Sequence, residues 1–376
     1  MGWRGGKLRV LAVGQTPPPY GGQAIAIESF VRGTYDQLEV THVRMGFSSD
    51  MKDVGHFRVS KVFHLVGLVA RILWARVTTK SDVLYYPPAG PDLVPVVRDI
   101  VVLLSTRWAF KRTVFHFHAG GLSEIYPRLP RLAQAAFRWA YFSPDLAIMP
   151  SAIGTNDAPF VHARRQVVVA NGVPELPPHL QPAPKPPRDR PVVLFVGVLR
   201  ESKGVLDLLR AAALVKKRGL ACEFQLMGQF APADFEVELK QQIHDLDLED
   251  DVALLGVRTG VEKDRAFSNA DVFCYPTFFE SETFGIVVVE AMRSALPVVV
   301  TDWRGVPALV REGETGFVVP VHDTDALADR LALLLTDPEM RVRLGSRGRQ
   351  VFLEQFTEEK FRSGMETELA RLSESA

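Results

Sequence analysis

The sequence predicts an α/β protein built from two doubly wound parallel sheets. Short apolar runs alternate with helical segments along nearly the whole chain, which is the pattern of strands joined by crossover helices. A proline-rich stretch, residues 176–191, interrupts this alternation once. A chain of 376 residues is also long for a single core. We therefore expect a first domain over residues 1–180, a linker over 181–191, a second domain over 192–356 and a terminal helix over 357–376.

The first domain begins with a buried strand, Leu8–Gly14, which runs into a loop. Further strands are expected over residues 83–86, 113–117, 146–149 and 167–169, and helices over 23–32, 58–80, 91–110 and 130–142. The helices over 58–80 and 91–110 are unusually apolar for the outside of a domain. Burial against the sheet explains this pattern. The alternative is that one of them lies on a membrane, helped by Lys61, Arg71 and Arg76.

The second domain repeats the alternation. Strands are expected over residues 192–196, 223–227, 252–255, 272–275, 298–301 and 316–319, and helices over 205–218, 235–246, 325–335 and 339–356. The terminal helix has Thr357 as its N-cap, with Glu358 and Glu359 in its first turn.

The composition and the lengths of the apolar runs argue against a disordered chain, a membrane-spanning protein and a disulfide-bonded one. Apolar residues make up 47% and charged residues 23%, which is ordinary for a globular protein. No apolar run has transmembrane length, and residues 8–13 are too short for the core of a signal peptide. Cys222 and Cys274 sit in apolar, strand-like contexts, so we expect buried free thiols in a reducing cytoplasm.

The two halves of the chain differ in charge. Residues 1–180 hold 20 Lys and Arg against 12 Asp and Glu, a net charge of +8, and the remaining residues carry −8. The first half either faces something acidic, such as a phosphate-bearing acceptor or an anionic membrane, or carries an uneven surface with no partner.

Residues 280–300 carry the most informative pattern. Glu282 and Glu290 are eight positions apart, with Phe284 and Gly285 between them at the start of a helical segment. A loop that enters a helix carries free N–H groups and the positive end of the helix dipole, so it can hold a phosphate. A carboxylate in the following helix can accept hydrogen bonds from sugar hydroxyls. Because Glu290 has apolar neighbours, its carboxylate needs partners. The segment indicates one half of a nucleotide-sugar site.

A lysine follows the first strand of the second domain. Lys203 precedes Gly204 and a helix, and ligands of open α/β sheets bind at the carboxyl ends of strands. A cation there can neutralise a diphosphate leaving group. The alternative is a solvated surface lysine, which the surroundings disfavour.

Five motifs in order resemble one family, the family-4 retaining glycosyltransferases (glycosyl transferases group 1). They are PPPYGG at 17–22, HFHAGG at 116–121, NGV at 171–173, VGVLRESKG at 196–204 and ExFGxxxxEAM at 282–292. The resemblance spans nearly the whole chain. It implies the GT-B fold, with two Rossmann-like domains facing a central cleft and a last helix that crosses back onto the first domain.

The resemblance also implies roles for single residues. His118, Lys203 and Glu282 would be catalytic. The donor would be bound by these residues together with Gly21, Gly22, Gly120, Arg200, Thr283, Phe284, Gly285 and Glu290. Glu290 would hold the ribose hydroxyls. Val198 stands where the family usually has an arginine, so Arg200 is the candidate for the second phosphate-binding cation.

His116 and His118 are expected to face opposite sides as they leave their strand, with His118 at the donor sugar and His116 structural. Asp-x-Asp occurs at 245–251 and 323–325 without a supporting histidine, which indicates solvated loops. We expect no metal and no cofactor besides the donor substrate.

The function implied is transfer of a hexosyl or hexosaminyl group from a nucleoside diphosphate sugar to a saccharide or lipid-linked saccharide, as in bacterial surface polysaccharide biosynthesis. The acceptor would bind the first domain, with its phosphates attracted by Lys61, Arg71, Arg76, Lys111 or Arg112. Peripheral membrane contact at the inner face is part of this expectation, and no nucleic-acid partner is. The alternatives are a UDP-sugar 2-epimerase-like isomerase and an inactive nucleotide-sugar-binding module.

Overall fold

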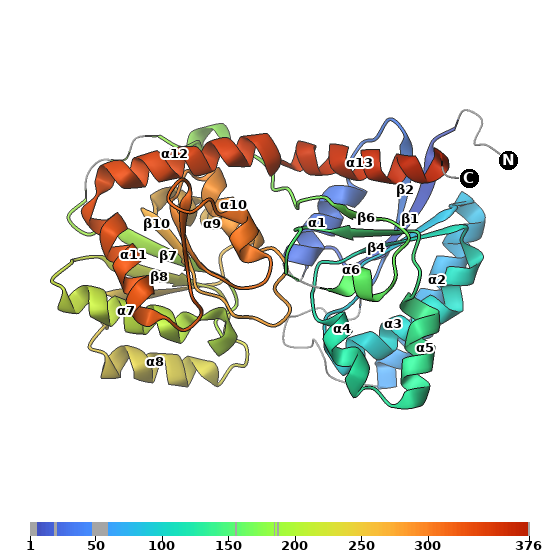
Figure 1. Ribbon diagram of the computed structural model, residues 1–376, viewed down its shortest axis with the longest axis horizontal. Coiled ribbons are helices and arrows are strands. Elements are labelled where there is room, and N and C mark those ends of the chain that lie inside the picture. Colours follow the sequence, from blue (N-terminus) through green and yellow to red (C-terminus); the bar gives the residue numbers. More distant parts are fainter. Residues whose placement is uncertain are drawn as a thin grey trace. The chain divides into compact units, whose positions relative to one another are not determined.

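The computed structural model describes residues 6–18, 21–46, 59–154, 156–183, 185 and 188–374, without the side chains of 59–62 and 374. Outside this description lie residues 19–20 of the first glycine motif, the start of the helix expected from residue 58, the side chain of Lys61 and three linker prolines at 184, 186 and 187. The chain divides into two compact units (Figure 1). Unit 1 comprises Met1–Gly172 and Glu358–Ala376, and unit 2 comprises Val173–Thr357.

Unit 1 is built on a six-stranded parallel sheet in the order β2-β1-β3-β4-β5-β6. The strands are β1 Leu8–Gly14, β2 Leu38–Arg44, β3 Val83–Tyr86, β4 Arg112–His116, β5 Leu146–Met149 and β6 Gln166–Val168. The sequence reasoning missed β2. Its residues LEVTHVR mix apolar and polar side chains because β2 is an edge strand that buries only Leu38 and Val43.

The two faces of this sheet are covered by different helices because side chains alternate along each strand. One face carries Leu11, Leu84 and Phe115 and packs against α2 Val59–Thr79, α3 Leu93–Thr106 and α5 Arg131–Tyr141. The other face packs against α1 Gly22–Val31 and the last helix, α13 Glu358–Glu374, through Phe361, Met365 and Leu369. The short helices are α4 Leu122–Ile125, α6 Asp157–Phe160, η2 Arg107–Ala109 and η3 Tyr126–Arg128. The last helix of the chain therefore completes the core of unit 1 (Figure 1).

Unit 2 has its own six-stranded parallel sheet in the order β12-β11-β10-β7-β8-β9. The strands are β7 Val192–Val196, β8 Glu223–Met227, β9 Val252–Gly256, β10 Val272–Tyr275, β11 Val298–Thr301 and β12 Gly316–Val319. The helices are α7 Val205–Lys217, α8 Phe235–Asp245, α9 Gly260–Asn269, α10 Ile286–Arg293, α11 Thr324–Thr336 and α12 Pro338–Gln355, with 3-10 turns η4 Pro178–Leu180, η5 Glu201–Lys203 and η6 Val306–Leu309. Every residue of β7 and β10 is buried, as expected for central parallel strands. The predicted pair of doubly wound parallel sheets is confirmed.

The proline-rich segment lies against unit 2. Unit 2 begins at Val173, earlier than the boundary expected at residue 180. Lys185 donates to the carbonyl of Ala270, Arg190 forms a salt bridge of 2.7 Å with Asp251, and the carbonyl of Pro191 accepts from the N–H of Glu223 over 2.9 Å. Because both side chains and backbone anchor it, the segment is a part of this unit's surface.

Cys222 and Cys274 are buried free thiols, as expected from their apolar neighbours, and burial raises the pKa of the Cys222 thiol to about 12. Among the helices of the described residues, none has the length and apolar character needed to cross a bilayer.

Candidate functional site

The candidate site of unit 2 lies where the winding of its sheet reverses. The chain runs outward from β7 to β9 and then from β10 to β12 on the other side, so β7 and β10 are neighbours. Loops that follow such a pair of strands diverge and leave a crevice at the carboxyl edge of the sheet. Lys203 follows β7 and Glu282 follows β10, so both sequence-predicted residues come to this edge.

Gly204 allows the two loops to approach each other. It has a φ of +72°, and a Cβ at this position would lie 1.9 Å from the carbonyl oxygen of Pro276. The backbone N–H of Phe278 donates to the carbonyl of Ser202 over 2.8 Å and ties the loops together. The glycine after Lys203 is therefore needed both for its left-handed backbone and for the close contact.

Lys203, Glu282 and Tyr275 form a compact polar cluster. The Nζ of Lys203 lies 2.6 Å from Oε2 of Glu282 and 2.8 Å from the hydroxyl of Tyr275. The Tyr275 hydroxyl donates to the same Oε2 over 2.6 Å. Burial opposes ionisation of Glu282, but the charge of Lys203 and the hydrogen bonds from Lys203 and Tyr275 hold the pKa of Glu282 below its usual value. Burial and the neighbouring Glu282 raise the pKa of Tyr275, so its hydroxyl stays protonated as a donor.

A second cation stands beside this cluster. The guanidinium of Arg200 lies 4.9 Å from the centre of the Phe279 ring, and Nζ of Lys203 lies 4.5 Å from the same centre. The indole of Trp303 donates to the carbonyl of Phe279 over 2.7 Å and fixes its backbone. Arg200 and Lys203 thus share Phe279 as a neighbour, although Val198 occupies the position expected for an arginine.

The start of α10 lies in the same loop. Gly285 has a φ of +82° directly before the helix, and Thr283 and Phe284 beside it are buried. The first turn of a helix leaves backbone N–H groups without partners inside the helix, which suits an anion. The Phe284 ring packs on Phe356, with 6.0 Å between ring centres, so Phe284 also anchors the loop.

Glu290 has a partner that the sequence reasoning missed. Both of its carboxylate oxygens accept from Nζ of Lys263 in α9, over 2.6 and 2.7 Å. One turn further along α10, Arg293 pairs with Asp264 of α9 over 2.5 Å. The expected need for a partner at Glu290 is therefore met within the protein. In the described part of the chain, no group of three or more His, Cys, Asp and Glu side chains is placed to hold a metal ion.

The positions of His116 and His118 in unit 1 contradict the prediction that their side chains face opposite sides. The rings of His116 and His118 lie on the same side, with 3.9 Å between their centres and an angle of 39° between their planes. The reason is the period of two along a strand, which puts residues i and i+2 on the same face. The Tyr85 hydroxyl and Nδ1 of His116 are 2.7 Å apart. Burial lowers the pKa of His118 to about 3, and burial together with His118 lowers the pKa of His116 well below its usual value.

The glycines of unit 1 occupy loops at the carboxyl edge of its sheet. Gly21 precedes α1 and Gly22 is its first residue. The loop that contains Gly120 is held by Asp157, which is fully buried and accepts from the N–H of Gly121 over 2.9 Å and from the N–H and hydroxyl of Ser123 over 2.7 Å each. Asp157 is a positioning residue that gave no sequence signal, because it lies in a short helix outside every recognised motif.

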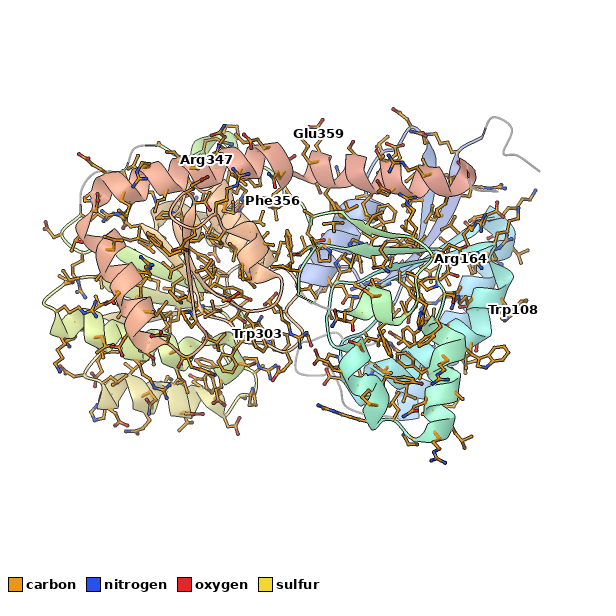
Figure 2. All side chains as sticks on the ribbon, in the orientation of Figure 1. Trp108, Arg164, Trp303, Arg347, Phe356 and Glu359 are labelled. Atoms are coloured by element: carbon orange, nitrogen blue, oxygen red, sulfur yellow. The ribbon has the colours of Figure 1, made fainter. Side chains whose placement is uncertain are left out.

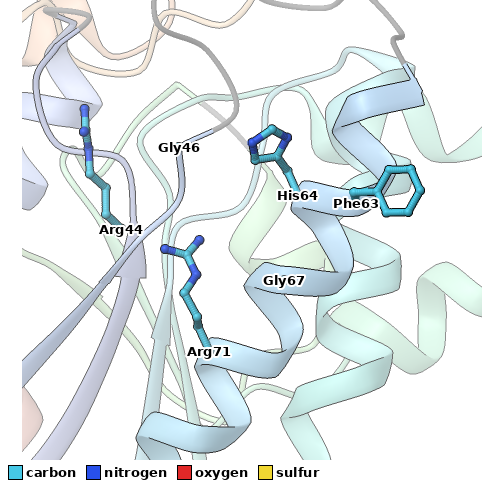
Figure 3. Close-up of a pocket in the computed structure, with 6 residues that line it drawn as sticks. All are labelled: Arg44, Gly46, Phe63, His64, Gly67 and Arg71. Atoms are coloured by element: carbon cyan, nitrogen blue, oxygen red, sulfur yellow. The ribbon is translucent and has the colours of Figure 1, made fainter.

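A basic pocket of about 520 Å³ also opens in unit 1. Arg44, Gly46, Phe63, His64, Gly67 and Arg71 line it. Figure 3 shows His64 and Arg71 on the side of α2 that faces Arg44, while the Phe63 ring lies on another side of the helix.

Of the expected acceptor-binding cations whose side chains the structure describes, Arg71 alone lines this pocket. Arg76 and Lys111 pair with Asp82, and Arg112 pairs with Asp145, near the amino ends of the strands. These three cations therefore stabilise the amino edge of the sheet, opposite the edge that carries the pocket.

The second half of the chain matches a family model. Residues 179–351 match the model described as Glycosyl transferases group 1, which confirms the resemblance to that group for this region. An alpha-D-kanosaminyltransferase of Streptomyces kanamyceticus is 36% identical over 156 residues, covering 42% of this chain and 39% of the relative.

Two other relatives match to a similar extent. A D-inositol 3-phosphate glycosyltransferase of Corynebacterium glutamicum is 34% identical over 157 residues, 41% of this chain and 37% of that protein. The amylovoran biosynthesis glycosyltransferase AmsK of Erwinia amylovora is 34% identical over 140 residues, 36% of this chain and 34% of AmsK. The matched stretch thus spans less than half the length of each of these relatives.

Solved structures match the chain over nearly its full length. HepE of Anabaena in complex with UDP superposes with a TM-score of 0.72 at 19% identity, covering 96% of this chain and all of that one. Sucrose-phosphate synthase of Thermosynechococcus elongatus gives 0.74 at 18% identity, covering 98% of this chain and all of that one. At such identities the likeness establishes the fold, which is GT-B.

Proposed function

We propose that the protein is a retaining glycosyltransferase that moves a hexosyl or hexosaminyl group from a nucleoside diphosphate sugar to a saccharide or lipid-linked saccharide hydroxyl. One observation carries the proposal: Lys203 pairs with Glu282 at the switch point of the unit 2 sheet, and Lys203 and Arg200 both lie against the ring of Phe279. Two cations and the amino end of a helix at this edge complement the negative charge of a diphosphate. The family match over residues 179–351 supports the same conclusion.

The cations would act on the leaving group. As the bond from the sugar to the diphosphate breaks, negative charge grows on the leaving phosphate, and a fixed positive charge stabilises that change. In the protein alone, Lys203 is neutralised by Glu282. An incoming diphosphate would share Lys203 and free the carboxylate of Glu282 for the hydroxyls of the donor sugar. Because two side-chain cations supply this charge, we propose that transfer needs no metal and no further cofactor.

The other predicted residues take supporting roles in this proposal. Glu290 would accept hydrogen bonds from the ribose hydroxyls while Lys263 holds its carboxylate in place. His118 would contact the donor sugar as a neutral ring, since its pKa near 3 keeps it uncharged at neutral pH. Thr283, Phe284 and Gly285 would bind the donor from the start of α10, and Gly21, Gly22 and Gly120 would approach the ligand through their backbone.

The acceptor half of the proposal places an acidic or lipid-linked saccharide on unit 1, in bacterial surface polysaccharide biosynthesis. The pocket of Arg44, His64 and Arg71 offers basic groups for its phosphate. Two relatives support this choice by their names, one for D-inositol 3-phosphate and one for amylovoran biosynthesis. The proposal includes a cytoplasmic location at the inner face of the membrane. HepE bound to UDP supports a uridine nucleotide as the first donor to test.

A panel of nucleoside diphosphate sugars tests the proposal. Thermal unfolding would identify the donors that bind, and slow hydrolysis in EDTA would show donor cleavage without metal. A transferase gives slow hydrolysis, and NMR of a transfer product shows retained anomeric configuration. An isomerase instead gives a sugar nucleotide changed at C2, and a binding module gives a thermal shift without turnover. Either of the last two results would overturn the proposal.

A further inference from the structure

The outer side of unit 1 exposes apolar side chains in regular stripes. On α2 the exposed residues Phe63, Val66, Trp74 and Val77 follow helical spacing, with 65–77% of each side chain accessible. The opposite side of α2 is buried in the core through Leu68 and Ile72. This helix is therefore apolar on two faces, and only one of them contacts the sheet.

The same pattern continues on the neighbouring helices. α3 exposes Val97, Val101 and Leu104, and Trp108 extends this stripe with 75% exposure. Figure 2 shows Trp108 projecting away from the ribbon of unit 1. α5 exposes Leu132 and Trp139, at 87% and 81%.

The three stripes adjoin one another. α3 contacts both α2 and α5, so we group the stripes of these three neighbouring helices as one surface, which we call the apolar face. Contiguous exposed apolar surface of this kind marks an interaction site. Unit 2 differs, because α8 exposes only Val237 as a large apolar side chain and α12 exposes Val342 and Leu353 far apart along the helix.

Charge identifies the occupant of the apolar face. The sequences of α2 and α5 contain no Asp or Glu, and the one acidic residue of α3, Asp99, is fully buried. Arg71, Arg131 and Arg138 are exposed on these helices. Apolar side chains with tryptophans and bordering arginines match the boundary between acyl chains and anionic headgroups. A second copy of the same face would bring arginines against arginines, which disfavours self-association.

We propose that the apolar face docks unit 1 peripherally on an anionic lipid bilayer, with the tryptophans at the headgroup boundary. This inference identifies the surface that would contact the membrane in the proposed function. Its evidence is the exposure and charge of α2, α3 and α5, which do not depend on that function. It can therefore be tested without a donor or an acceptor.

Vesicle flotation with the full chain gives the first test. Binding is expected to vesicles of phosphatidylcholine mixed with phosphatidylglycerol and to be weaker on phosphatidylcholine alone. It should fall as salt rises, because charges are screened beyond about 10 Å at 0.1 M salt. Brominated acyl chains should quench tryptophan fluorescence, since Trp74, Trp108 and Trp139 are three of the five tryptophans. Absence of binding to both vesicle types would overturn the inference.

Two valines provide a matched pair of variants. Val77 on the apolar face and Val237 on α8 are 73% and 74% exposed, so a glutamate at either site should leave folding intact. Val77→Glu should lower the affinity for anionic vesicles at least fivefold, and Val237→Glu should leave it unchanged. Arg131→Gln should lower it about fivefold, the usual effect of one basic residue near an anionic surface. Equal binding by both valine variants would contradict the inference.

Two further measurements separate the possible failures. If Val77→Glu alters the oligomeric state in light scattering instead of vesicle binding, the face is a contact between copies. Donor hydrolysis without vesicles should be the same in Val77→Glu and the unmodified protein. Loss of vesicle binding with hydrolysis retained is the expected outcome. Vesicle binding by a protein that cleaves no donor would refute the proposed function and leave the docking surface standing.

Discussion

The two units use the same sheet plan but have different chemistry at its carboxyl edge. In unit 2, Lys203 and Glu282 are a charged pair 2.6 Å apart, and Lys263 and Glu290 form a second pair. In unit 1, the edge carries two adjacent histidines whose pKa values are lowered by burial, so both are neutral at pH 7. A shared architecture therefore carries buried charged pairs at this edge in unit 2, and two buried neutral histidines with a basic pocket in unit 1.

The outer surfaces repeat this difference. Unit 1 carries the excess of basic residues and the apolar face, while the acidic excess lies in the second half of the chain. The order of the strands in a sheet determines where the loops of each unit meet. The residues at the strand ends and on the outer faces of the helices then determine which ligands or partners that unit can contact.

Replacing Lys203 should have the largest effect, because it removes the charge that defines the edge of unit 2. Lys203→Ala should reduce the turnover number about 100-fold to 1000-fold, as is typical when one group that stabilises transition-state charge is removed. Donor affinity should fall less, since the phosphate charge is larger in the transition state. Steady-state kinetics measures both. Lys240→Ala is the control, because Lys240 is an exposed lysine of α8 that pairs only with Glu236 among the recorded ion pairs. Wild-type turnover in Lys203→Ala would show that the site is misplaced.

Replacing Glu290 tests whether the second charged pair of unit 2 also binds the donor. Glu290→Gln should weaken donor binding about tenfold or more, the usual loss when hydrogen bonds to a charged group are weakened. Calorimetric titration with the nucleoside diphosphate measures this loss. The double variant Lys263→Met/Glu290→Gln provides the control. If it restores both thermal stability and donor affinity, the pair is structural and Glu290 has no role at the ribose.

The histidines of unit 1 predict a pH effect on stability. Below the usual histidine pKa of 6.5, His116 and His118 gain protons on unfolding but stay neutral when folded. The unfolded state then binds more protons, so the unfolding free energy is highest above pH 6.5. It falls as the pH drops towards 3, by about 1.4 kcal/mol per pH unit for each histidine. Urea unfolding between pH 7 and about 5 measures this slope.

Two substitutions test the source of that slope. His118→Gln should flatten the pH dependence, and His179→Gln, at an exposed position, should not. The same slope in both variants would mean that His118 does not keep a lowered pKa in the folded state, which would contradict the neutral edge of unit 1.

Much of this architecture could be predicted from the sequence because central strands are continuous apolar runs. The run Val192–Val196 and the valines of β11 predicted strands with the correct bounds. Lys203 was identified because it follows such a strand, and Glu282 because it lies in a loop that enters a helix. β2 was missed because an edge strand has a mixed pattern.

Pairings between distant residues could not be predicted. Tyr275 ends an apolar strand, and nothing in its neighbours shows that its hydroxyl meets Glu282. Lys263 lies in a polar helix, where a lysine is usually solvated. The apolar character of α2 and α3 had two explanations, burial or contact with a membrane. Periodicity could not separate them, because both faces of α2 are apolar and only one of them packs on the sheet.

The position of α13 has a consequence for synthesis of the protein. Phe361, Met365 and Leu369 cover one face of the unit 1 sheet, yet they are translated after the whole of unit 2. A nascent chain on the ribosome therefore carries the strands of unit 1 with that face uncovered while Val173–Thr357 emerges. Unit 2 is continuous in sequence and can close as soon as it has left the exit tunnel. The unit that is made first is thus the unit that is completed last, and its uncovered face is what a ribosome-associated chaperone would meet.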